Sequence, residues 1–238
     1  MEFVYVVENN LTDEICDAII QQFEEERENQ EEGVCGVGVK ETSLKKTMDL
    51  VMNQHEHWME KYDAILNEAL HRGLDEYFEY IVDDITFGEH KLLESLTCAG
   101  LRKTAWQVQK YSKGDYFKWH ADKDNNTLRE LAVIWYLNDV DITKGGATEF
   151  IYGGSITPKK GSLLIFPATW TYIHRGTELI GDQNKYIITA FLCNNGKYIP
   201  PDSVEDYETS KIGDKYRMSV RGDGRGCGRP RDHPHFHV

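Results

Sequence analysis

The stretch that decides the fold is TAWQVQKYSKGDYFKWHAD, which runs from Thr104 to Asp122. It opens a part of the chain in which short runs rich in β-branched and aromatic residues are separated by Gly, Asp, Asn and Pro. The runs after the first, TAWQVQKY, are LAVIWYLN, ATEFIY, SLLIF and KYIITAFL. Several short strands at close spacing predict a β-sandwich or barrel.

The residues before this stretch show a different pattern of apolar residues. Phe3 to Val7 reads as a short strand, and an amphipathic helix is expected from about Thr12. The acidic run from Glu24 to Gly33 is interpreted as the frayed, solvated end of that helix. From Leu44 to Tyr80 the apolar residues again recur three or four apart, which predicts helix.

These patterns predict a single structural domain with three segments. Residues 1–103 should supply a strand and helices that pack on the core, and residues 104–200 should form the β core itself. Residues 201–238 are expected to be a C-terminal extension ending in a mobile tail rich in Gly, Arg and His, which has almost nothing apolar to bury.

Composition restricts the classes of function. The 238 residues carry a formal net charge of -13, which repels phosphate backbones and disfavours nucleic acid as a partner.

The five cysteines are far apart and form no CxxC pair, so reduced thiols are expected. Without a basic-then-apolar leader or a run long enough to cross a membrane, a soluble, cytoplasmic protein is expected. The sequence does not predict an oligomeric state.

The candidate metal ligands begin with His120 and Asp122. Residues two apart in an extended segment point to the same side, so these two can converge on one ion. His174, in FPATWTYIHRG after a strand-like run, is the candidate third ligand. Two neutral imidazoles and one carboxylate suit non-haem Fe(II) and leave three coordination positions open.

A basic residue follows His174 at an interval that can bring it close to the candidate metal. Lys185 lies eleven residues after His174, at the head of the run KYIITAFL. One strand can then end at the metal while the next returns past it, which brings an ammonium close enough to pair with a carboxylate that is not a ligand. Arg175 is a second candidate anion partner, but its side chain should point elsewhere if His174 points inward.

Taken together, these residues resemble the prolyl 4-hydroxylase-like branch of the 2-oxoglutarate oxygenases, whose pattern is HxD, a distant His, then a basic residue. The resemblance covers roughly Thr104 to Asn194 and includes GGATEF at Gly145 to Phe150 and PKKG at Pro158 to Gly161. The interval from His174 to Lys185 is about one residue longer than in prolyl hydroxylases.

The resemblance implies a mainly β, α+β fold, a double-stranded β-helix or jelly roll buttressed by the N-terminal helices. It also implies Fe(II), 2-oxoglutarate and O2 as cofactor and co-substrates, with ascorbate as a candidate reductant. Lys185 is then expected to neutralise the far carboxylate of 2-oxoglutarate, with Tyr111, Tyr136 and Thr189 as candidate hydrogen-bonding partners of the co-substrate. Alternatively, the two tyrosines are aromatic residues of the core and Thr189 is a strand residue, with no contact to the co-substrate.

The expected reaction is hydroxylation of an unactivated C–H bond with release of succinate and CO2. A prolyl residue in a peptide or protein is the leading substrate, with a free amino acid or other small metabolite as the main alternative. The alternative from a different class of function is a non-catalytic metal-binding jelly roll. Side chains expected either in a substrate wall or in the core are Trp119, Trp135, Trp170 and Tyr172, and the polar loop from Lys123 to Leu128 is a candidate lid.

Overall fold

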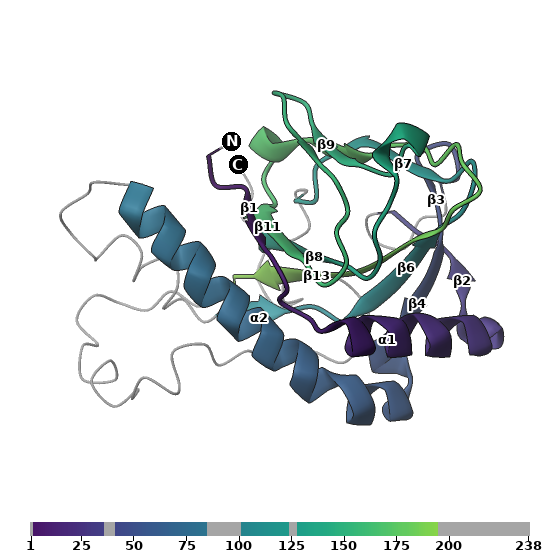
Figure 1. Cartoon of the computed structure of the whole chain (residues 1–238). Helices are drawn as coiled ribbons and strands as arrows, with labels where there is room; N and C mark the ends of the chain where they lie inside the picture. The colour runs from purple at the N-terminus through teal and green to yellow at the C-terminus, as the bar shows by residue number, and fades with distance from the viewer. Residues whose placement is uncertain (1, 36–40, 85–100, 124–127, 195–238) are drawn as a thin grey trace, which may run out of the picture.

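Two antiparallel sheets face each other, and two helices cover the outer face of the larger sheet (Figure 1). This computed structural model describes residues 2–35, 41–84, 101–123 and 128–194. Before residue 100 its elements are β1 (Tyr5–Val7), α1 (Asp13–Glu25), the 3-10 turn η1 (Arg27–Asn29), β2 (Glu31–Glu32), β3 (Lys45–Lys46), β4 (Met48–Val51), η2 (Met52–Gln54) and α2 (Glu56–Asp84). After residue 100 they are β5 (Arg102–Lys103), β6 (Gln107–Tyr111), β7 (Tyr116–His120), β8 (Arg129–Tyr136), η3 (Ile142–Lys144), β9 (Thr148–Phe150), β10 (Ser155–Ile156), β11 (Leu163–Pro167), η4 (Trp170–Tyr172), β12 (His174–Gly176) and β13 (Lys185–Cys193).

The strand order is that of a double-stranded β-helix. The larger sheet runs β1-β11-β8-β13-β6-β4-β2, with β5 also pairing with β13, and the smaller runs β10-β9-β12-β7-β3. From β6 to β9 consecutive strands alternate between the sheets, β9 and β10 both lie in the smaller sheet, and the alternation resumes from β11 to β13. The jelly roll that the family resemblance implies is therefore confirmed, and each predicted β-rich run contains a strand.

Alternating side chains on β8 show how the core is divided. Val133 and Trp135 point toward α1 and α2 in the larger apolar cluster, whereas Ala132, Ile134 and Tyr136 point into the space between the sheets. This follows from the two-residue period of a strand. The larger sheet is thus buried on both faces, which explains why LAVIWYLN is an almost unbroken apolar run.

The first helix begins where the sequence predicts. The Thr12 hydroxyl caps α1 by accepting a hydrogen bond from the Ile15 backbone N–H, and Cys16, Ile19 and Phe23 form its buried face. The acidic run after it is not a frayed end, so that expectation is wrong. Glu24 accepts hydrogen bonds from the Lys110 ammonium at 2.6 Å and the Tyr186 hydroxyl at 2.9 Å, and β2 then joins the larger sheet.

The helical prediction from Leu44 is wrong for its first twelve residues. β3 pairs with β7 in the smaller sheet, and β4 pairs with β6 in the larger one. Residues 45–49 therefore cross from one sheet to the other, and α2 begins only at Glu56. Pairing with strands far along the chain overrides the local pattern here.

The cysteines differ from expectation at one position. Cys16 and Cys35 are free, but Cys193 at the end of β13 is disulfide-bonded, so the expectation of reduced thiols is wrong for this residue. In the described part of the chain, no helix has the length and apolar character needed to cross a bilayer. The predicted C-terminal tail lies outside the described residues.

Candidate functional site

Three candidate ligands meet where β7 and β12 lie side by side. His120 is the last residue of β7, Asp122 follows two residues later, and His174 opens β12 directly opposite His120 in the strand register. His174 thus begins a short strand after a 3-10 turn, rather than ending a strand. The ligand atoms of the three residues lie within 4.8 Å of one another.

Backbone carbonyls fix the orientation of both imidazole rings. Nδ1 of His120 is 2.8 Å from the Lys118 carbonyl oxygen, and Nδ1 of His174 is 3.0 Å from that of Tyr172. A carbonyl can only accept, so each Nδ1 carries a proton, and the tautomer this selects places the lone pair of the ring on Nε2. The two Nε2 atoms lie 3.5 and 3.6 Å from the oxygens of Asp122.

The protonation states match a divalent metal site. Burial opposes ionisation of Asp122, but the neighbouring His174 and His120 hold its pKa at about 2. Burial lowers the pKa of His174 to about 4, so its imidazole is neutral at physiological pH. A carboxylate and imidazoles that converge through unprotonated nitrogens fit Fe(II), and these three residues could hold it.

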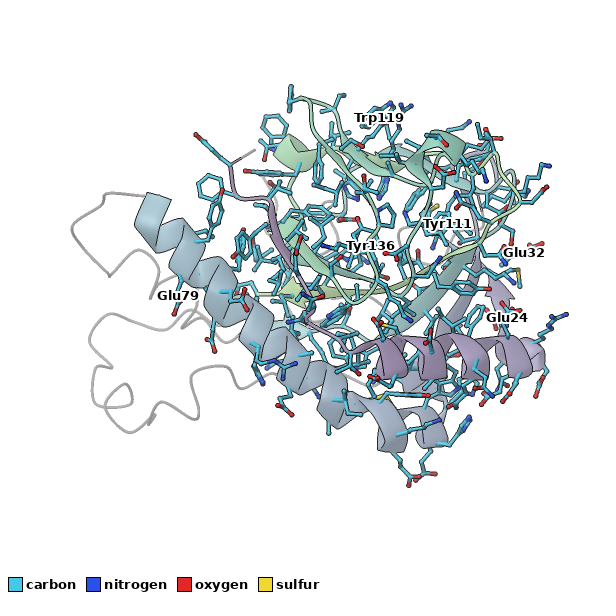
Figure 2. The ribbon with its side chains drawn as sticks, in the orientation of Figure 1. Glu24, Glu32, Glu79, Tyr111, Trp119 and Tyr136 are labelled. Atoms are coloured by element: carbon cyan, nitrogen blue, oxygen red, sulfur yellow. The ribbon has the colours of Figure 1, made fainter. Side chains whose placement is uncertain are left out.

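A cavity of about 500 Å³ extends between the sheets from these ligands. It is lined in part by Tyr111 from β6, Thr148 from β9, and Lys185 and Thr189 from β13. Figure 2 shows Tyr111 and Tyr136 in the interior between the two sheets. The site can therefore enclose a small molecule that reaches the candidate metal ligands.

Lys185 is a buried cation in the wall of this cavity. It is the first residue of β13, its exposed fraction is 2%, and burial lowers the pKa of its ammonium to about 7. The ammonium lies 5.0 Å from the ring centre of Tyr111 and 5.5 Å from that of Tyr136. No hydrogen bond or ion pair to the Lys185 ammonium is formed by any residue that the structure describes. An anion bound here would gain a partner that the fold leaves unpaired.

The three other candidate co-substrate partners differ in position. Tyr111 and Thr189 line the cavity, and both hydroxyls contact the side-chain amide of Gln109, at 3.3 and 3.2 Å. Tyr136 does not line the cavity, and its hydroxyl donates to Thr148 Oγ1 at 2.8 Å. The structure thus places Tyr111 and Thr189 in the cavity wall with Lys185, whereas Tyr136 is not part of that wall. All three hydroxyls already have a hydrogen-bond partner.

Gln109 is part of a polar chain that sequence reasoning missed. Tyr111 donates to Gln109, Gln109 Nε2 donates to Gln107 Oε1 at 3.0 Å, and Gln107 Nε2 donates to Asp49 Oδ2 at 2.9 Å. Gln107 and Gln109 share a face of β6 with Tyr111. That two-residue spacing is a signal that was present in the sequence.

Arg175 lies on the other side of the smaller sheet, as its place beside His174 predicts. Its guanidinium donates to Glu149 Oε2 at 2.6 and 2.8 Å and lies 4.6 Å from the ring centre of Trp119. Figure 2 places Trp119 on the outer side of the molecule, away from the interior tyrosines. Arg175 therefore does not contribute to the cavity lining.

The remaining aromatic candidates divide between core and surface. Trp135 is fully buried against the helices, and Tyr172 packs partly buried on the cluster between the sheets. Trp119 and Trp170 are exposed, and none of the four lines the cavity. Most of the candidate lid, residues 124–127, lies outside the described residues.

The comparisons with known proteins agree with this geometry. Residues 106–193 match the model of the 2OG-Fe(II) oxygenase superfamily, and this range contains all three candidate ligands and Lys185. No curated protein sequence matches the chain.

Solved structures of prolyl hydroxylases share the fold. A Trichoplax adhaerens prolyl hydroxylase in complex with a hypoxia inducible factor peptide fragment is similar at a TM-score of 0.59 and 17% identity, covering 89% of each chain. A Pseudomonas putida prolyl-4-hydroxylase gives 0.57 and 11%, covering 82% of this chain and 94% of its own. A viral collagen prolyl hydroxylase from Paramecium Bursaria Chlorella virus-1 gives 0.53 and 17%, covering 80% and 96%.

Proposed function

This chain belongs to the 2OG-Fe(II) oxygenase superfamily and is a 2-oxoglutarate-dependent dioxygenase, and from this we propose that it hydroxylates a prolyl residue in a peptide or protein. The observation that carries the proposal is one cavity that joins a His-Asp-His cluster to an unpaired buried lysine. The prolyl hydroxylases that share the fold support the substrate class.

The proposed roles follow from the geometry of the side chains. His120, Asp122 and His174 hold Fe(II) through Nε2 and carboxylate oxygens that already converge. Lys185 binds the far carboxylate of 2-oxoglutarate, and the hydroxyls of Tyr111 and Thr189 orient it. When bound, iron and 2-oxoglutarate supply the oxidising chemistry, in which decarboxylation to succinate and CO2 is coupled to insertion of one oxygen atom into a C–H bond.

The protein itself contributes binding, orientation and exclusion of water. Phe117, Ile134 and Ile187 give the cavity apolar walls, and a low-dielectric surrounding strengthens charge pairing at Lys185. The backbone carbonyls behind the imidazoles hold the Nε2 lone pairs toward the metal position. Ascorbate as reductant belongs to the proposal through the family resemblance alone.

Alanine variants of the three ligands test the proposal. His120→Ala, Asp122→Ala and His174→Ala should each abolish Fe(II) binding and 2-oxoglutarate consumption while melting cooperatively, because the ligands lie at the cavity and outside the two apolar clusters. Iron content, succinate formation and thermal melting would be measured together. A variant that kept near-normal turnover would remove that residue from the proposed site.

A peptide screen tests the substrate. Wild-type enzyme would be given capped peptides containing proline and, separately, free L-proline and other free amino acids, with mass spectrometry to detect a gain of one oxygen atom. Oxygen gain on peptides supports the proposal. Oxygen gain on free amino acids alone would favour the small-metabolite alternative, and 2-oxoglutarate binding without any turnover would favour a non-catalytic protein.

A further inference from the structure

The cavity wall has polar side chains besides Lys185 and the candidate metal ligands. Residues of the N-terminal part of the chain, including Val34 and Lys45, line it together with Gln107 at the start of β6. Lys45 and Gln107 have no role in the proposed iron and 2-oxoglutarate binding. Their chemistry therefore bears on what else enters the cavity.

Lys45 is a buried, ion-paired cation in this wall. Its ammonium lies 2.6 Å from Asp49 Oδ2, and the exposed fractions of the two side chains are 3% and 5%. Gln107 Nε2 donates to the same carboxylate oxygen. An ammonium has three N–H donors, and within the described residues only the one directed at Asp49 is used.

The pair lies where the chain crosses between the sheets. Lys45 is opposite Phe117 of β7 in the smaller sheet, and Asp49 is opposite Gln109 of β6 in the larger one. A purely structural pair could serve to close this corner. However, apolar residues of similar volume usually stabilise a buried position as well as an ion pair does, because burial strips both charges of water.

An incomplete set of partners points to a ligand. Asp49 Oδ1 is buried and has no hydrogen-bond partner among the residues described, and two donors of Lys45 are likewise unused. Buried polar groups are normally satisfied, so Lys45, which lines the cavity with unused donors, is suited to a polar molecule that supplies acceptors.

The Lys45 ammonium is also close to the proposed reaction centre. It lies 5.5 Å from the ring centre of Phe117, and that ring stacks on the His120 imidazole at 3.5 Å between centroids and an interplanar angle of 11°. One aromatic ring therefore contacts both the ammonium and a proposed iron ligand. A group hydrogen-bonded to Lys45 would hold its neighbouring atoms near the metal.

We propose that Lys45 is a specificity residue that donates a hydrogen bond to a backbone carbonyl of the peptide substrate, with Asp49 as the residue that positions it. This inference rests on the proposed peptide hydroxylation and deepens it. A neutral carbonyl fits because Asp49 already balances the charge of Lys45. The carboxylate of a free amino acid would add a second negative charge beside Asp49, so the pair favours peptides.

The first test is the Michaelis constant for a peptide. The probe is the capped proline-containing pentapeptide that wild-type enzyme turns over best in the screen above. Lys45→Met should raise its KM by about 10- to 100-fold, the effect of losing one hydrogen bond from a charged donor. The KM should change more than the affinity for 2-oxoglutarate measured without peptide. Lys103→Met is the control, because Lys103 is a buried lysine paired with Asp63 that does not line the cavity.

A double variant tests the inference even if the single variant Lys45→Met does not fold. Lys45→Met leaves Asp49 buried and unpaired, whereas Lys45→Met with Asp49→Leu removes both charges. The double variant should fold and show the same rise in peptide KM. A folded double variant with wild-type KM would overturn the inference and leave the pair structural. Absence of peptide hydroxylation by wild-type enzyme would instead refute the proposed substrate, and with it this inference.

A second readout is specific to the positioning role. Asp49→Asn leaves the charge of Lys45 unbalanced, so the enzyme should shift toward peptides with a free carboxylate. The measurement is the ratio of kcat/KM for a peptide ending in proline with a free C-terminus to that for its amidated form. The ratio should rise at least threefold over wild type. An unchanged ratio would show that Asp49 does not tune Lys45 toward neutral groups.

Discussion

Replacing Lys185 with methionine should stabilise the ligand-free protein while removing its response to 2-oxoglutarate. The ammonium is buried, and no carboxylate pairs with it in the described part of the chain. Methionine fills a similar volume without a charge. The residue proposed to bind the co-substrate is thus expected to reduce stability until the co-substrate arrives.

The lowered pKa sets the magnitude of this effect. Burial lowers the pKa of Lys185 from 10.5 to about 7, and each pH unit corresponds to about 1.4 kcal/mol. Near pH 7 the free-energy cost of this group is therefore on the order of 3–5 kcal/mol. Between pH 7 and 10.5 the unfolded chain binds more protons than the folded one, so wild-type stability rises with pH in that window. The advantage of Lys185→Met should fall to about 1–2 kcal/mol by pH 9.5 and stay constant below pH 7.

Urea unfolding of the metal-free protein at pH 7 and pH 9.5 measures this. Melting with Fe(II), in the presence and absence of 2-oxoglutarate under anaerobic conditions, then tests the added response to the co-substrate, which only wild type should show. Lys103→Met is the comparison, because burial also lowers the pKa of that ammonium but Asp63 offsets part of this cost, so its gain in stability at pH 7 should be smaller than that of Lys185→Met. If Lys185→Met were less stable than wild type at pH 7, the ammonium would have a favourable environment in the free protein and the reasoning would be refuted.

Two further predictions concern residues outside the cavity lining. Arg175→Ala should leave the affinity for 2-oxoglutarate within about twofold of wild type, because its guanidinium binds Glu149 on the outer face; calorimetric titration checks this, and a larger loss than in a Lys185 variant would reverse the assignment. Gly145→Ala should lower the free energy of unfolding by about 2–4 kcal/mol, since φ is +81° and a Cβ would lie 1.8 Å from a backbone oxygen. Gly153→Ala, at φ +98° but in open space, should cost only about 1 kcal/mol in the same denaturant titration.

Much of the core could be predicted because its signals are local. Each β-rich run contains a strand of the jelly roll, and Thr12 marks the start of α1. The close approach of His120 and Asp122 follows from the two-residue period of an extended chain. Their meeting with His174 needed the family resemblance, because the pairing of β7 with β12 joins residues more than fifty positions apart.

The parts that were missed depend on distant partners. β3 and β4 are two and four residues long and carry charged side chains, so nothing local distinguishes them from a helix, and only pairing with β7 and β6 defines them. From the sequence, charged residues such as Lys45 and Asp49 are expected at the surface, but the fold buries both. Gln109 shares a face with Tyr111, but its bond to Thr189 requires the neighbouring strand.

Both outer strands of the larger sheet and one of the two outer strands of the smaller sheet come from the first fifty residues, and this limits how the enzyme can be shortened. β1 flanks β11, β4 flanks β6 and β3 flanks β7. The family-matched part alone, residues 106–193, would leave three strands with unpaired backbone N–H and C=O groups. Such exposed edges recruit further chains, so this fragment should self-associate through strand addition, even though it contains every proposed iron and 2-oxoglutarate contact.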